Sequence, residues 1–84
     1  MKKIITNVYN ATTTKNNKRI LKVFDKEHFH IINFICDNTV PFQAFVDYEG
    51  KDLEFVFASP STFSNFGDLV RVTYNGKVIY DAIP

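Results

Sequence analysis

Residues that build disulfides, phosphate-binding loops and metal centres are scarce in this sequence. Its 84 residues include one cysteine, three glycines and two histidines. No glycine-rich phosphate loop, nucleophile elbow, paired-cysteine motif or HExxH motif occurs, and each of these carries a defined chemistry. Cys36 follows Phe-Ile in an apolar run, where a thiol is usually inert core. We therefore expect a protein without enzymatic activity and without a cofactor.

Long apolar runs are also missing. The first segment, MKKIITNVYNATTTKNN, has no stretch long enough for a signal peptide or a membrane span, and one cysteine cannot form an intramolecular disulfide. We therefore expect a cytoplasmic protein with no membrane partner. The recurrence of Lys, Asn, Ile and Phe is typical of AT-rich coding sequence and, with the short length, indicates a phage or mobile-element gene, in which case the cytoplasm is that of the host.

Charge is unevenly distributed, although the net charge is only +1. Residues 1–30 hold seven Lys and Arg residues but two carboxylates, whereas residues 31–84 hold three Lys and Arg residues and seven carboxylates. The small net charge argues against strong nonspecific binding to polyanions. The asymmetry is compatible with two solvated faces or with a functional dipole, and the sequence leaves both readings open.

Aromatic residues are abundant, with nine Phe and four Tyr. Each ring can bury about 150–250 Å², which compensates for the small core of a chain this short. Three segments rich in β-branched and aromatic residues, 3–9, 18–24 and 28–36, are predicted strands, and the polar residues 10–17 a loop between the first two. Apart from its two histidines and Asn33, the strand 28–36 is apolar on both alternating sets, as in a strand covered on both faces or one that bends around a barrel. We expect residues 1–84 to form a single β-rich domain.

Two hairpins are predicted in the second half. Glu49-Gly50 would join strands 42–48 and 51–57, with Val46 facing Leu53 on the core side and Asp47 facing Asp52 on the other. Asn75-Gly76 is a strong hairpin signal between strands 69–74 and 77–82, and would place Val72 opposite Ile79.

A short helix near residues 60–66 is predicted between these hairpins. Ser59 suits the N-cap, Pro60 the first helical position and Gly67 the position after the end. Phe63 and Phe66 would then share one face, and for these rings we favour burial in the core over an exposed contact surface. The prediction is a mainly β fold, α+β by strict count: a small barrel or curved antiparallel sheet of six to seven strands. Its element order is similar to that of OB-like and SH3-like barrels in about equal measure.

Functionally, the first hypothesis is a non-enzymatic module that acts through protein-protein interaction, as a phage or mobile-element inhibitor of a host enzyme or defence system. A protein partner would meet the acidic patch of the predicted hairpin, where like charges face each other. The patch comprises Asp47, Glu49, Asp52 and Glu54. The uneven charge and the last predicted hairpin, which is apolar on both faces, are also compatible with a homodimer that covers strand edges.

Two alternatives remain open. A single-stranded nucleic-acid-binding barrel would use basic and aromatic residues of the first half, although half of these charges fall on opposite sides of their strand. The candidates are Lys18, Arg19, Lys22, Lys26, Phe24 and Tyr9. The second alternative is a His-dependent metal-binding or hydrolytic protein, since His28 and His30 lie on the same side of a strand, with Asp25 or Glu27 as further ligands. Two histidines alone do not make a metal site.

Overall fold

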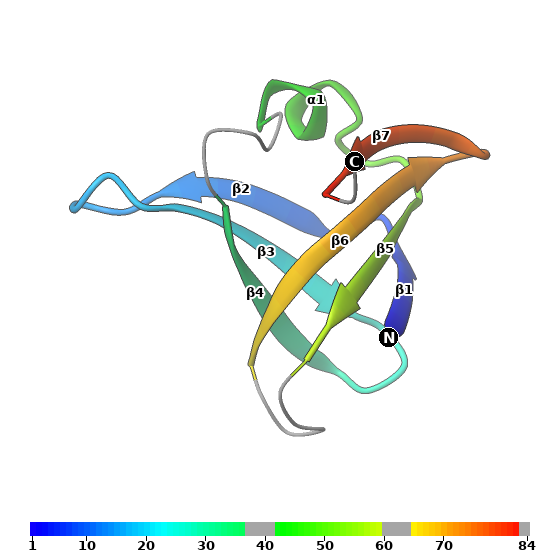
Figure 1. Ribbon diagram of the computed structural model, residues 1–84, viewed down its shortest axis with the longest axis horizontal. Coiled ribbons are helices and arrows are strands. Elements are labelled where there is room, and N and C mark those ends of the chain that lie inside the picture. The colour runs from blue at the N-terminus through cyan, green and yellow to red at the C-terminus, as the bar shows by residue number, and fades with distance from the viewer. Residues whose placement is uncertain (37–41, 60–64, 83–84) are drawn as a thin grey trace.

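The computed structural model describes residues 1–36, 42–59 and 65–82. In this part of the chain seven strands form one sheet, and one short helix accompanies them (Figure 1). The elements are β1 (Lys2–Thr6), β2 (Tyr9–Thr13), β3 (Arg19–Asp25), β4 (His30–Cys36), α1 (Phe42–Asp47), β5 (Leu53–Ala58), β6 (Phe66–Tyr74) and β7 (Lys77–Asp81). The fold is therefore mainly β, as predicted.

The sheet is strongly curled but does not close into a barrel (Figure 1). Its strands follow the order β1-β5-β6-β4-β3-β2, and β7 pairs with β6 off this path. The pairing is antiparallel except between β4 and β6, where Asn33 and Phe34 run parallel to Phe66 and Gly67. Neither the OB-like nor the SH3-like order is confirmed.

Gly67 allows the two halves of the sheet to meet. A Cβ atom at this position would lie 3.0 Å from the Phe34 ring and 3.1 Å from the Ala58 carbonyl oxygen and the Phe57 ring. Such contacts are closer than packed side chains tolerate. Only glycine therefore lets β6 cross this closely between β4 and β5.

Large apolar side chains fill the inside of the curled sheet. Phe34, Phe55 and Phe57 are almost completely buried, and the Phe34 and Phe57 rings meet edge to face with centroids 5.3 Å apart. The other buried apolar residues are Ile4, Leu21, Val23, Ile32, Cys36, Phe45, Leu53 and Val72. Burial of aromatic rings supplies the large apolar area that a domain of this size needs.

The predicted first hairpin is wrong, because residues 42–47 form α1 and not a strand. Apolar residues at every second position suggested a strand, but Phe42 and Phe45 are also three apart, and in a helix both turn toward the core. The Gln43 side chain donates a hydrogen bond to Asp47 Oδ1 at 3.1 Å across one turn. The strand after the turn is confirmed as β5, but its partners are β1 and β6. Asp47 therefore does not face Asp52 across a hairpin.

The polar loop predicted at 10–17 is also wrong in its first half. Residues 9–13 form β2, which pairs with β3 so that Ala11 lies opposite Leu21 and Asn10 opposite Lys22. Strand pairing uses backbone N–H and C=O groups, and residues with polar side chains supply these groups as well as apolar residues do. The strand predicted over 3–9 is interrupted at Asn7 and Val8, where the Val8 amide donates to Thr6 Oγ1 at 3.1 Å.

The second hairpin is confirmed, with Tyr74 opposite Lys77 and positive φ angles of 49° at Asn75 and 82° at Gly76. A register shift between Val72 and Thr73 places Val72 opposite Tyr80. The predicted pairing of Val72 with Ile79 is therefore wrong by one residue.

The short helix predicted near 60–66 falls mostly on residues 60–64, including Phe63, which lie outside the described residues. Phe66 begins β6 and is 52% exposed, so its expected burial in the core is wrong.

Candidate functional site

An apolar surface covers the side of β3 and β4 that faces away from the core. Side chains alternate along both strands, so Leu21, Val23, Ile32 and Phe34 are buried while their neighbours point outward. Phe24 lies opposite Ile31 in the register, Lys22 opposite Asn33 and Ile20 opposite Ile35. Phe66 is on β6 and pairs with Asn33 of β4. We call the following residues the outer face: Ile20, Lys22, Phe24, Phe29, Ile31, Asn33, Ile35, Asn65 and Phe66.

Several of these apolar side chains are strongly exposed. The exposed fraction is 81% for Phe29, 62% for Ile35, 52% for Phe66 and 49% for Ile31. The Phe24 and Phe29 rings meet edge to face with centroids 6.5 Å apart. Together with Lys22, Ile31, Asn33 and Asn65 they line a shallow depression. The outer face is therefore a connected patch.

The turn Lys26–Phe29 presents Phe29 on this patch. Asp25 Oδ1 accepts hydrogen bonds from the amides of Glu27 at 3.0 Å and His28 at 3.3 Å, which fixes the turn. Phe29 then adopts a left-handed backbone with φ 53°. This conformation costs a bulky residue about 1–2 kcal/mol. Phe29 occupies the last position of the four-residue loop between β3 and β4, where hairpin loops commonly need a left-handed residue, and its ring is left exposed.

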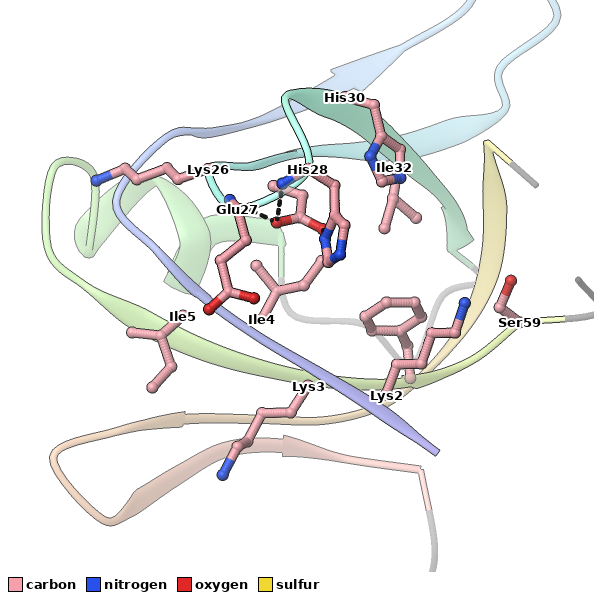
Figure 2. A pocket seen from close by; sticks show the side chains of 12 residues that line it. Lys2, Lys3, Ile4, Ile5, Lys26, Glu27, His28, His30, Ile32 and Ser59 are labelled. Carbon is pink, nitrogen blue, oxygen red and sulfur yellow. Dashed lines mark hydrogen bonds and ion pairs between the residues drawn. The ribbon is translucent and has the colours of Figure 1, made fainter. Parts of the chain in front are cut away.

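A pocket of about 480 Å³ lies on the other side of the same turn, beside the start of β1 (Figure 2). His28 and His30 stand at its rim with ring centroids 6.0 Å apart, and Lys2 approaches from the opposite side. Ile4, Ile32 and Phe57 provide its apolar part. The remaining lining residues are Lys3, Ile5, Asp25, Lys26, Glu27 and Ser59.

Asp25 orients His28 in this pocket. The distance between His28 Nδ1 and Asp25 Oδ2 is 2.8 Å, and Asp25 is 6% exposed. Burial opposes ionisation of the Asp25 carboxyl, but the hydrogen bonds from the His28 ring and from the amides of Glu27 and His28 outweigh it, so the pKa of Asp25 is lowered. Asp25 therefore remains an anion and holds the imidazole in one orientation.

The predicted acidic patch is arranged differently from the sequence expectation. Asp47 ends α1, Glu49 and Asp52 lie in the connection to β5, and Glu54 lies on β5. Glu54 forms an ion pair with Lys3 on β1 at 4.0 Å. Asp47, Glu49 and Asp52 thus lie at the end of α1 or in the connection that follows it, whereas Glu54 has a basic neighbour on β1.

The candidate nucleic-acid residues are divided among different parts of the fold. Tyr9 points inward: its ring packs on Phe55 with centroids 5.5 Å apart, and its hydroxyl donates to the backbone carbonyls of Tyr48 and, at 2.8 Å, Lys51. Burial, with smaller contributions from nearby Asp52 and Glu49, raises the pKa of Tyr9.

The basic candidates are also separated. The guanidinium of Arg19 lies 5.5 Å from the centroid of the Phe42 ring. Lys22 and Phe24 are on the outer face, Lys26 is in the turn that borders the pocket, and Lys18 directly precedes β3. Only Lys22 and Phe24 of the predicted set are brought together on one surface.

Metal binding gains no third ligand from the fold. Within the described residues, no group of three His, Cys, Asp or Glu side chains could hold an ion. The His28 and His30 rings are neighbours, but Asp25 is engaged by His28 and the turn amides.

In the part of the chain that the structure describes, no helix is long and apolar enough to cross a membrane.

Sequence reasoning missed Phe29, Ile31, Ile35 and Phe66 as exposed residues. The sequence signal was present, since 28–36 is apolar on both alternating sets. The pattern predicts a strand covered on both faces or bent around a barrel, whereas the described elements cover only its inner face.

Comparison of the chain with protein-family models, with curated proteins and with solved structures finds no match.

Proposed function

We propose that this protein is a non-enzymatic binding module that docks another protein on the outer face. The observation that carries the proposal is the connected exposure of Phe29, Ile31, Ile35 and Phe66. Single exposed apolar residues are ordinary, but contiguous apolar patches on small domains mark interaction sites.

The chemistry of the outer face favours a partner with an apolar surface and a carboxylate. Lys22 is its charged member, at the centre of β3 and opposite Asn33. A symmetric dimer formed through the centre of this face would place Lys22 near its own copy, and like charges at an interface are unfavourable. We therefore favour a different protein over a second copy. The composition typical of phage genes makes an inhibitor of a host protein the first form of this proposal to test.

Single-stranded nucleic acid is a second candidate ligand for the same surface. Phe24 and Phe29 lie beside Lys22, and exposed rings next to a cation are the elements on which bases stack. The inward position of Tyr9 removes an aromatic ring from this surface and the contact with Phe42 removes Arg19, so a protein partner is favoured.

Affinity capture from the source cell tests the proposal with two matched variants. The double substitution Ile31→Lys and Ile35→Lys introduces two charges on the outer face, and the triple reversal Asp47→Lys, Asp52→Lys and Glu54→Lys alters the acidic end. We expect a specific protein to be retained by the wild type and by the acidic-end variant but lost from the outer-face variant. Circular dichroism must show that both variants remain folded.

Loss of partner capture with the acidic-end variant alone would contradict the proposal. That result would place the binding site at Asp47, Asp52 and Glu54. If light scattering shows a wild-type dimer that Ile31→Lys and Ile35→Lys abolish, the outer face binds a second copy of this chain and not a different protein. Salt-steep binding of labelled single-stranded DNA would favour the nucleic-acid alternative.

A further inference from the structure

The pocket beneath the Lys26–Phe29 turn brings together groups that bind phosphate. His28, His30 and Lys2 surround its mouth, while Ile4, Ile32 and Phe57 form its apolar part (Figure 2). We propose that this pocket binds a small phosphate-bearing molecule. The proposal concerns a site separate from the outer face and does not depend on the proposed function.

The contact between Asp25 and His28 prepares the imidazole for this task. Nδ1 donates to the Asp25 carboxylate at 2.8 Å, which leaves Nε2 for a ligand. As a neutral ring, His28 accepts a hydrogen bond from a P–OH group, and as a cation it donates one to a P–O⁻ group. His28 can therefore hold phosphate in either protonation state, from an orientation that Asp25 fixes before binding.

The charges around the pocket are favourable on one side only. The Lys2 side chain lies across the cavity from His28 and His30 with its ammonium group on the side of Ser59, whereas the Lys3 and Lys26 ammonium groups point away from the cavity (Figure 2). Lys3 forms its ion pair with Glu54. Glu27 is the carboxylate at the opposite edge, near Ile5. The phosphate group is thus expected between Lys2 and the two imidazoles, away from Glu27.

The size and apolar part of the pocket indicate the rest of the ligand. A volume of about 480 Å³ lies within the range of small-molecule sites and exceeds what a phosphate ion alone occupies. Ile4, Ile32 and Phe57 offer apolar contact but no charge. A phosphate monoester with an apolar or aromatic group should therefore bind more tightly than inorganic phosphate.

Titration of the isotopically labelled protein by NMR tests this inference, with phenyl phosphate, inorganic phosphate and sulfate as probes at low salt. We expect phenyl phosphate to shift the amide signals of the pocket residues and to bind more tightly than either inorganic ion. The variants Lys2→Gln and His28→Gln should each weaken binding by about tenfold or more, because each removes a charge-assisted contact.

Three controls make the result specific. Lys77→Gln removes a positive charge on β7, which does not line the pocket, so it should keep close to the wild-type affinity. Glu27→Gln removes the opposing carboxylate and should strengthen binding. The outer-face variant with Ile31→Lys and Ile35→Lys should bind phenyl phosphate normally, so the two proposals fail independently.

Absence of shifts at the pocket with millimolar phenyl phosphate would overturn the inference. So would binding that Lys77→Gln weakens as much as Lys2→Gln, because that result would show unspecific attraction to positive charge. Equal affinity for inorganic phosphate and phenyl phosphate would overturn the assignment of an apolar portion to the ligand. Lys2 and His28 are exposed, so their variants are expected to fold.

Discussion

The two faces of β3 and β4 are similarly apolar in sequence but have opposite surroundings. The inner face, with Leu21, Val23 and Phe34, is completely buried, whereas Ile31 and Ile35 on the outer face are about half exposed or more. No described element of the chain covers the outer face. The comparison teaches that strand composition alone does not separate core from contact surface, because both require the same side chains.

Truncation of the two faces should separate their roles most sharply. Phe34→Ala removes a fully buried ring that packs on Phe57 and should lower the free energy of unfolding by about 3–5 kcal/mol. Ile35→Ala, its neighbour on the outer face, should change it by less than about 0.5 kcal/mol. Urea denaturation measures both. A similar large loss for Ile35→Ala would show that the outer face is covered in the free protein.

Asp25 holds the turn that joins β3 and β4, so its substitution should have the next largest effect on the free energy of unfolding. Asp25→Ala leaves two amides and the His28 ring without their acceptor and should cost about 1–3 kcal/mol. Because the folded-state pKa of Asp25 is lowered, its stabilising effect is present above the unfolded pKa and is lost as pH falls through the folded pKa.

The pH dependence supplies the check on that prediction. Wild-type stability should fall in acid more than that of Asp25→Asn, measured by urea denaturation between neutral and acidic pH. Parallel pH profiles for the two proteins would contradict the role assigned to the Asp25 carboxylate.

Phe29 should behave in the opposite way from a core ring. Phe29→Gly removes an exposed side chain from a left-handed position and should raise the free energy of unfolding by about 1 kcal/mol. The same substitution should weaken capture of the partner. Thermal denaturation gives the first result and affinity capture the second. Destabilisation by Phe29→Gly would indicate that the ring is structural.

Tyr9 provides the smallest effect, on the inner side of β2. Tyr9→Phe keeps the ring against Phe55 but removes the hydroxyl that binds the carbonyls of Tyr48 and Lys51, at a cost of about 0.5–1.5 kcal/mol.

Alkaline pH should test the same hydroxyl. Since the pKa of Tyr9 is raised in the folded state, the stability associated with its neutral form is present below the unfolded pKa and is lost as pH rises through the folded pKa. Denaturation measured at neutral and alkaline pH should therefore show a smaller difference between Tyr9→Phe and wild type at high pH. A constant difference would contradict this.

The strand-rich fold and the last hairpin could be predicted from local signals. Asn75-Gly76 specifies a turn by its backbone preferences alone, and β3 and β4 have strong β propensity. Residues 42–47 could not be assigned, because apolar residues at 42, 44, 45 and 46 satisfy both strand and helix periods in so short a segment. The choice between helix and strand depends on the long-range core contacts of Phe45, which the local sequence does not show.

The sites depended even more on long-range structure. The His28 and His30 pair was visible in sequence, but its pocket requires β1 to lie beside the Lys26–Phe29 turn. The outer face is exposed because no described element covers that side of β4. Local sequence does not determine which elements cover a strand. The acidic patch was inferred from a hairpin that does not form, so its geometry failed with that hairpin.

The most direct test of the outer face as a binding surface is site-specific photo-cross-linking in the source cell. A photoreactive amino acid would replace Ile35 on the outer face or Val78 on β7, whose exposed fractions are 62% and 52%. We predict a discrete cross-linked partner from position 35 and none from position 78. Cross-linking from position 78 but not from position 35 would contradict the assignment of the outer face as the binding surface.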